Sequence, residues 1–304
     1  MTELGERPID VVRAMLTSLL GGPDASIAHR RAQAALFAAS QPPPPPGLRI
    51  APTVLGGVPA ETIEVEEDAK PHLFLHLHGG GYVMGDPGGS RGFTTALALA
   101  TRARVVSLDY RLAPDHPFPA AVDDALAAYA DVLAQGAPSG RVAIGGESAG
   151  GGLTVALLLA IRDAGLPLPA CAVVMSPWVD LTCAGDSYDT RAARDPLLTR
   201  DVLLEMADQY LGGRDPRSPF ASPAGADLSG LPPLLIQVGA DEVLLDDAIA
   251  LGKGAQAAGV RTQLEIWPDM IHVWQMFAGT LPQADEAIQR IVEFLARSWR
   301  AEAP

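Results

Sequence analysis

The segment Gly146–Gly150 reads G-E-S-A-G, which matches the pattern G-x-S-x-G and offers a serine hydroxyl for nucleophilic attack. An apolar segment at residues 141–145 precedes it, and an apolar helical segment at residues 153–161 follows it. A serine on such a strand-to-helix turn is pushed out of the backbone, because its small neighbours leave room for it. The pattern alone also fits an ordinary tight turn, but its setting favours Ser148 as a nucleophile. We expect Glu147 to support the turn through a hydrogen bond or an ion pair.

A nucleophilic serine needs a general base, and in this kind of fold the chain order is serine, acid, histidine. Of the six histidines only His272 lies downstream of Ser148, so we predict that His272 takes the serine proton. The acid that orients the histidine should follow a parallel strand, where the serine also lies. Asp241 follows the apolar segment 234–238 and is the predicted acid, with Asp180 as the alternative. The next carboxylates are expected to cap the following helix or to face solvent: Glu242, Asp246 and Asp247.

A glycine-rich segment, His78–Tyr82, reads H-G-G-G-Y and follows the apolar segment 73–77. Successive glycines at the end of a strand can present backbone N–H groups to a developing negative charge. We therefore predict that Gly79 and Gly80, together with Ala149, form an oxyanion hole. A phosphate-binding loop is the other use of such glycines. The chain, however, contains neither G-x-x-x-x-G-K-[ST] nor a G-x-G-x-x-G with an acidic residue placed for a ribose.

Three histidines share one face of the strand expected here and could suggest a metal site: His72, His76 and His78. Crowding within a parallel sheet and the lack of a matching acidic cluster argue against metal binding. The chemistry predicted for Ser148 requires neither a metal nor a cofactor. We therefore expect no bound metal and no cofactor.

The composition restricts the class of protein and its partners. The chain has 304 residues, of which 48% are hydrophobic and 19% charged, so it can bury a substantial core. Its net charge of −14 argues against nucleic acid or an anionic membrane as a partner. Two cysteines exclude a disulfide scaffold and favour a cytoplasmic location. Glu3, Glu6 and Asp10 stand where a signal peptide would be basic, and no apolar run reaches the roughly 20 residues of a membrane span.

Short apolar segments alternate with amphipathic helical segments, which indicates a parallel sheet covered by helices on both faces. Strands are expected at residues 62–66, 73–77, 104–108, 142–145, 172–176, 234–238 and 262–267. Residues 1–46 are predicted to form a helical cap segment with the proline spacer Pro42–Pro46, and residues 47–304 an α/β catalytic domain. A stretch without strands, at about 182–230, is predicted to be an insertion that covers one end of the sheet with the N-terminal helices.

Several motifs together resemble the hormone-sensitive-lipase-like esterases, the bacterial lipolytic family IV. They occur in order between about residue 49 and the C-terminus: H-G-G-G-Y at His78–Tyr82, D-Y-R-L-A-P at Asp109–Pro114, G-E-S-A-G at Gly146–Gly150 and S-P-W-V-D-L-T at Ser176–Thr182. The resemblance implies an α/β-hydrolase fold with a mostly parallel sheet and a helical cap. It also implies the triad Ser148, Asp241 and His272, with oxyanion donors at Gly79, Gly80 and Ala149.

We therefore expect a serine carboxylesterase that forms an acyl-enzyme on Ser148. The resemblance implies short- to medium-chain esters as substrates and suggests a homodimer. A lactonase, an amidase or a peptidase could use the same residues, because these substrates share an addition intermediate. A non-hydrolytic small-molecule receptor on the same fold is the remaining alternative. The plant gibberellin receptors resemble these esterases but lack the catalytic histidine, whereas this chain has His272.

Overall fold

The computed structural model describes residues 7–19, 25–41 and 43–300, and one sheet forms its centre. The strands are β1 Leu48–Leu55, β2 Val58–Val65, β3 Leu73–Leu77, β4 Arg104–Leu108, β5 Val142–Glu147, β6 Cys171–Met175, β7 Leu234–Gly239 and β8 Thr262–Trp267. Their order across the sheet is β1-β2-β4-β3-β5-β6-β7-β8. β2 is antiparallel to both β1 and β4, and all other neighbouring strands are parallel. The predicted mostly parallel sheet is confirmed.

β1 and the first half of β2 were not predicted, and they form a hairpin at one edge of the sheet. Their side chains alternate between buried and exposed only in part, so the pattern expected of a strand is weak. The turn between them is Gly56-Gly57, and both residues have positive φ angles, 57° and 84°. Two such residues close a two-residue hairpin turn. This pair of glycines was the signal that could have predicted the hairpin.

Helices cover both faces of the sheet, which explains why the central strands are continuously apolar. The α-helices in the described ranges are α1 Pro8–Leu19, α2 Ile27–Ser40, α3 Arg91–Thr101, α4 Ala120–Ala134, α5 Ala149–Asp163, α6 Ser187–Thr190, α7 Arg200–Leu211, α8 Leu245–Ala257 and α9 Pro282–Arg300. The described ranges also contain four short 3-10 helices: η1 Pro87–Ser90, η2 Ser139–Arg141, η3 Pro223–Gly225 and η4 Trp274–Phe277. One core cluster joins α3 and α9 to the sheet, and another joins α4, α5 and α8 to its opposite face. β3, β5, β6 and β7 are buried along their whole length.

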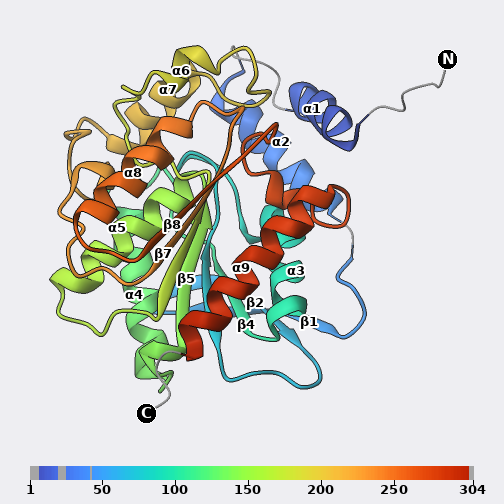
Figure 1. The fold of residues 1–304 in the computed structure, drawn as a ribbon, viewed down its shortest axis with the longest axis vertical. Helices are drawn as coiled ribbons and strands as arrows, with labels where there is room; N and C mark the ends of the chain where they lie inside the picture. Colours follow the sequence, from blue (N-terminus) through green and yellow to red (C-terminus); the bar gives the residue numbers. More distant parts are fainter. Residues whose placement is uncertain (1–6, 20–24, 42, 301–304) are drawn as a thin grey trace.

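Four helices, which we call the cap helices, gather at one end of the sheet: α1, α2, α6 and α7 (Figure 1). α6 and α7 belong to the segment between β6 and β7, where the insertion was predicted. Tyr210 of α7 stacks on Tyr82 in the loop after β3, with ring centroids 3.8 Å apart. Arg31 of α2 donates hydrogen bonds of 2.6 Å to the carbonyl oxygens of Val83 and Ala113. The cap helices are therefore attached to the loops at the carboxyl ends of the strands.

Some predictions concern residues outside the described ranges, namely those on Glu3, Glu6 and Pro42. The remaining prolines of the spacer, at 43–46, connect α2 to β1. The division into a segment 1–46 and a domain 47–304 stays a prediction. Within the described ranges, no helix is both long and apolar enough to cross a membrane.

A buried carboxylate on α8 fastens the insertion to the sheet. Asp247 Oδ2 accepts the N–H groups of Val179 and Asp180 after β6, each at 2.9 Å. Its Oδ1 accepts the hydroxyl of Tyr188 in α6 at 2.9 Å. Burial raises the pKa of Asp247 to about 7, although these hydrogen bonds oppose the shift. The folded protein therefore binds a proton at this site more strongly than the unfolded chain does.

We predict that Asp247 makes the folded state less stable as the pH rises. When folding raises the pKa of an acid, the free energy of unfolding falls as the pH rises from the unfolded-state pKa to the folded-state pKa. For Asp247 these pKa values are 3.8 and about 7. In Asp247→Asn this part of the pH dependence should disappear. Urea unfolding at about pH 5 and about pH 8 measures it, with Asp163→Asn on the surface as the control. An equal decline in wild type and Asp247→Asn would contradict the prediction.

Candidate active site

The serine of the G-E-S-A-G motif lies on a strained turn between β5 and α5. Ser148 has φ 55° and ψ −123°, a conformation that non-glycine residues rarely adopt and that marks functional turns. Both motif glycines are needed because β3 approaches closely. A Cβ atom would lie 2.3 Å from the Leu77 carbonyl oxygen at Gly146 and 2.0 Å from it at Gly150. The turn thus holds the Ser148 hydroxyl at the carboxyl end of the parallel strands.

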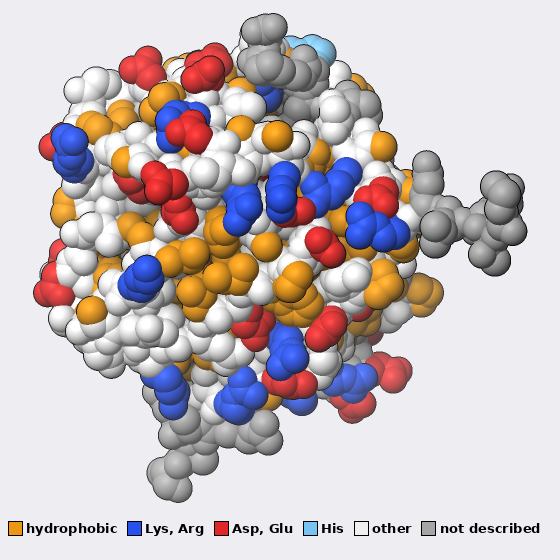
Figure 2. Space-filling view, turned by 45° about the horizontal axis from the view of Figure 1, so that its top comes forward, with side chains coloured by type: hydrophobic (Ala, Val, Ile, Leu, Met, Phe, Trp, Pro, Cys, Tyr) orange, Lys and Arg blue, Asp and Glu red, His pale blue; other side chains and the backbone are white. Residues whose placement is uncertain are grey.

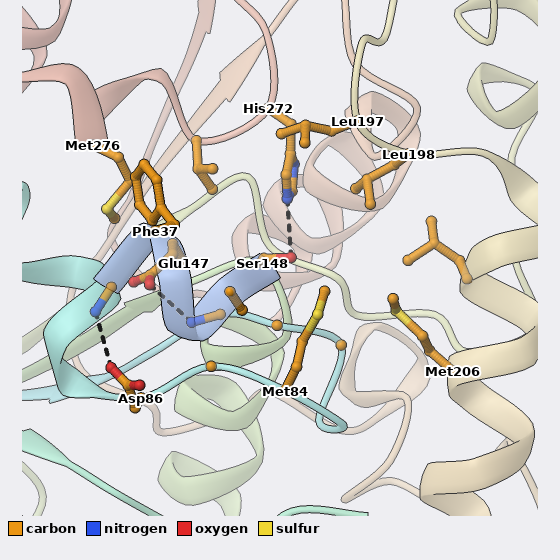
Figure 3. A pocket seen from close by; sticks show the side chains of 18 residues that line it. Phe37, Met84, Asp86, Glu147, Ser148, Leu197, Leu198, Met206, His272 and Met276 are labelled. Atoms are coloured by element: carbon orange, nitrogen blue, oxygen red, sulfur yellow. Dashed lines mark hydrogen bonds between the residues drawn. The ribbon is translucent and has the colours of Figure 1, made fainter. Parts of the chain in front are cut away.

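His272 lies in the loop between β8 and η4 and reaches the serine. Its Nε2 atom is 2.9 Å from Ser148 Oγ (Figure 3). Only 4% of the His272 surface is exposed, so the pair is largely shielded from water. The next residue, Val273, has φ 50° and donates its N–H to Ser176 Oγ at 3.1 Å. This backbone bond holds the histidine loop against the end of β6.

The carboxylate beside His272 belongs to Glu242 rather than to Asp241. His272 Nδ1 lies 2.7 Å from Glu242 Oε2. The other oxygen, Oε1, accepts the Gly239 N–H at 2.6 Å and the Ser176 hydroxyl at 2.8 Å. The Glu242 side chain is fully buried. The prediction that Asp241 orients His272 is therefore wrong, and so is the expectation that Glu242 caps a helix or faces solvent.

Asp241 points away from His272, toward the cap helices. Its carboxylate accepts Arg13 Nη2 at 2.7 Å and Arg194 Nη1 at 3.1 Å. The alternative acid, Asp180, is also engaged elsewhere, because its Oδ1 accepts the N–H and the hydroxyl of Thr182. The prediction that a carboxylate after β7 supports the histidine is thus correct in position. Which of the neighbours Asp241 and Glu242 faces His272 depends on the backbone path of the turn, which the sequence pattern does not reveal.

Buried charge determines the pKa of His272. Burial lowers this pKa, but the hydrogen bond and the negative charge of Glu242 raise it by more, with further contributions from Asp195 and Glu147. The net result is a pKa above the ordinary value of 6.5. A raised pKa makes the imidazole a stronger base toward the serine hydroxyl.

Glu147, next to the serine, holds the glycine loop in place. Its Oε1 accepts the Gly79 N–H and the Ser90 hydroxyl, each at 2.8 Å, and its Oε2 lies 2.7 Å from His76 Nε2. Burial raises the pKa of Glu147, but the interaction with His76 and the other hydrogen bonds outweigh it, so the pKa is lowered. The carboxylate therefore stays charged in the core. The expected supporting contacts of Glu147 are present.

The N–H group of Gly79 is thereby occupied, which contradicts its predicted place in an oxyanion hole. Within the described residues, no protein acceptor binds the N–H of Gly80 or Gly81, and both residues line a cavity in front of Ser148. Ala149 begins α5, where the N–H groups of the first turn have no partner inside the helix. Sequence reasoning missed Gly81 because three successive glycines look alike until the loop has a conformation.

The cavity in front of the serine has a volume of about 190 Å³ and a mostly apolar wall. Met84 and Met206 lie on one side of Ser148 in Figure 3, and Phe37 and Met276 lie on the other. These side chains come from a loop after β3, from α7, from α2 and from η4. Further apolar side chains complete the wall: Ala34, Leu197, Leu198, Leu203 and Val273. The cap helices α2 and α7 thus enclose the space that a substrate would fill.

Comparison with known proteins agrees with this architecture. A family model described as alpha/beta hydrolase fold matches residues 74–276. A crystal structure of an esterase from the bacterial hormone-sensitive lipase family is 46% identical, with a TM-score of 0.92 over 96% of this chain and 98% of that one. The chain belongs to the hormone-sensitive-lipase-like family of α/β-hydrolases. The predicted fold class and the resemblance that the motifs indicated are both confirmed.

Curated relatives in this family have names that state an activity. An acetyl-hydrolase from Streptomyces hygroscopicus is 54% identical over 221 residues, which are 73% of this chain and 74% of the relative. An esterase from Acinetobacter venetianus is 36% identical over 250 residues, 82% of each chain. The hydrogen-bonded residues Ser148, Glu242 and His272 all lie within residues 74–276, the part of the chain that the family model matches.

We predict that Glu147→Gln destabilises this hydrolase-family protein and slows its reaction. The amide has one oxygen and one NH2 group, so it cannot accept on both the side of Gly79 and Ser90 and the side of His76, and it removes the buried negative charge beside His76. A mismatched buried hydrogen bond costs about 1–3 kcal/mol. Urea unfolding measures the stability. The value of kcat, measured where the variant is folded, shows whether the glycine loop still supports the reaction. Glu67→Gln, an exposed glutamate, is the control; equal effects of the two substitutions would contradict the supporting role.

Proposed function

We propose that this protein is a serine carboxylesterase that hydrolyses short- to medium-chain carboxylic esters through an acyl-enzyme intermediate. The observation that carries the proposal is the continuous hydrogen-bonded series from Ser148 through His272 to Glu242, opening into an apolar cavity. A serine, an imidazole and a buried carboxylate in this order are the parts that acyl transfer requires.

In the proposed reaction, His272 Nε2 takes the proton of Ser148 as its oxygen attacks the ester carbonyl. Glu242 accepts the hydrogen bond from Nδ1–H, keeps the correct tautomer and stabilises the imidazolium that forms. The imidazolium then protonates the departing alcohol, which leaves the acyl group on the serine. Water enters, His272 removes one of its protons, and the hydroxide oxygen adds to the acyl carbonyl. The intermediate then breaks its bond to the serine oxygen, which takes the proton back from His272, and the carboxylic acid leaves.

Negative charge on the tetrahedral intermediate needs hydrogen-bond donors. We assign this role to the N–H groups of Gly80, Gly81 and Ala149, for which the described residues supply no hydrogen-bond acceptor. Gly80 and Gly81 line the cavity, and Ala149 follows Ser148 directly. Gly79 takes no part, because its N–H donates to Glu147. Losing one donor of this kind raises the barrier by about 2.7–4 kcal/mol in other enzymes. Glu147 therefore contributes by holding the loop that carries two of these donors.

The cavity supports small acyl groups as substrates. Its volume of about 190 Å³ is below the range of roughly 300–1,000 Å³ typical of drug-sized ligands. Its wall is apolar apart from a few groups near the serine, so an aliphatic acyl chain would be favoured over a charged one. The names of the relatives, acetyl-hydrolase and esterase, agree with this substrate class.

Two further predictions concern the setting of the protein. The cytoplasmic location stays a prediction from the cysteine count. Cys171 and Cys183 are free and buried, and burial raises the pKa of each thiol to about 12. Such thiols are unreactive, which fits a structural role in the core. The homodimer stays a prediction from the family resemblance.

The test is hydrolysis of p-nitrophenyl esters from acetate to palmitate by wild type and Ser148→Ala. We expect turnover of the short esters, falling with chain length as the acyl group outgrows the cavity. Ser148→Ala should reduce kcat by at least about a thousandfold, because the nucleophile is lost while the fold remains. Circular dichroism and urea unfolding establish that the variant is folded.

Matched lactone and amide substrates separate this proposal from its alternatives. Amide turnover equal to ester turnover would contradict the carboxylesterase assignment, and so would lactone turnover without ester turnover. Inactivity of wild type on all three bond types would leave binding rather than hydrolysis as the function. Ser229→Ala is a suitable control, since Ser229 is exposed and does not line the cavity.

A further inference from the structure

Asp241, displaced from His272, joins three segments that are far apart in the sequence. Arg13 of α1 donates through Nη2 to Asp241 Oδ2 at 2.7 Å and to the Asp269 carbonyl at 3.1 Å. Its Nη1 donates to the Arg194 carbonyl at 2.6 Å. Arg194 Nη1 in turn donates to Asp241 Oδ1 at 3.1 Å. One aspartate thus holds the first helix, the insertion and the turn after β7 together.

A second carboxylate, that of Asp195, also connects the insertion to the turn after β7. Asp195 Oδ2 accepts the Val243 N–H at 3.0 Å. Its Oδ1 accepts the N–H groups of Leu197 and Leu198 at 2.9 and 3.0 Å. Both leucines line the cavity in front of the serine. The residues on either side of Glu242 are therefore bonded to the part of the insertion that forms the cavity wall.

Apolar packing places α1 against the histidine loop. A separate core cluster contains Ile9, Val12 and Leu16 of α1 together with Met270, Ile271 and Trp274. Leu197 of the cavity wall packs against the same cluster. The space-filling view of this end of the molecule shows basic side chains next to acidic ones (Figure 2). The helix that donates Arg13 to Asp241 therefore also packs its apolar side chains against the histidine loop.

We propose that Arg13, Asp241 and Arg194 form a clasp that holds α1 and the cavity wall at residues 194–198 against the loops carrying Glu242 and His272. Asp241 is then a positioning residue that determines how tightly the acyl group is bound. The inference rests on the proposed esterase function for its kinetic consequence, but not for its structural one. It gives Asp241 a role that is different from that of Glu242, its neighbour in the chain.

The clasp should affect substrate binding more than proton transfer. Asp241 makes no hydrogen bond to His272, and its side chain is only 13% exposed, so its two ion pairs are partly shielded from solvent. Loss of the clasp would loosen Leu197 and Leu198 without removing the carboxylate beside the imidazole. We therefore expect KM to rise while the pH midpoint of kcat/KM stays where it is in wild type.

The experiment compares wild type, Asp241→Asn, Arg194→Gln and the control Arg102→Gln. Arg102 forms an exposed ion pair with Asp68, and its removal changes no contact of the cap helices. KM and kcat for p-nitrophenyl butyrate are measured as a function of pH. Limited trypsin digestion then follows the rate at which α1 is cut, which needs no catalytic activity.

For Asp241→Asn and Arg194→Gln we expect KM to rise about two- to fivefold, the size expected from losing exposed or partly exposed ion pairs, and α1 to be cut faster. The control should match wild type in both readouts. Unchanged KM and unchanged cleavage in Asp241→Asn would overturn the clasp. A large loss of kcat with a shifted pH midpoint would overturn it too, because Asp241 would then act on His272. If wild type hydrolyses no ester, the cleavage rates still decide whether the clasp exists.

Discussion

The hydrogen bond between His272 Nδ1 and Glu242 Oε2, 2.7 Å long, is the interaction on which the site depends. A buried carboxylate is costly unless its oxygens are paired, and the chain meets this constraint from three directions. The Gly239 N–H and the Ser176 hydroxyl satisfy one oxygen, and the imidazole satisfies the other. Ser176 also accepts the N–H of Val273. The end of β6, the turn after β7 and the histidine loop are thus fixed to one another by a single acidic group.

A second buried carboxylate, that of Glu147, positions the glycine loop next to the serine turn. Glu147 precedes the serine on β5, and its carboxylate fixes the Gly79 N–H, so the glycine loop and the serine turn cannot move independently. Two buried carboxylates therefore place the two sets of groups that acyl transfer needs, the proton-transfer pair and the oxyanion donors. The cap helices close the apolar space between them, and Asp241 and Asp195 connect the cap to the turn that carries Glu242.

The sequence predicted the sheet, the serine turn and the histidine loop, because these depend on local pattern and chain order. Apolar segments between turn residues fixed most strands, and His272 is the only histidine downstream of Ser148. Two errors have a common cause. Asp241 and Glu242 are adjacent carboxylates, and Gly79 and Gly81 are identical in type. Only the backbone path decides which carboxylate meets His272 and which glycine N–H is taken up by Glu147. The arginine partners of Asp241 lie 228 and 47 residues away in the chain, beyond the reach of a local pattern.

The pH dependence of kcat/KM for an ester, measured in Glu242→Gln and Asp241→Asn, tests most directly whether Glu242 is the acid that supports His272. Because the pKa of His272 is raised, wild-type activity should rise with pH through a midpoint above 6.5. Glu242→Gln should lower kcat/KM by about 10³–10⁴ and move the midpoint down, since the charge that opposes the effect of burial is gone. Asp241→Asn should keep the wild-type midpoint and most of kcat. The opposite assignment of these two effects would contradict Glu242 as the acid that supports His272.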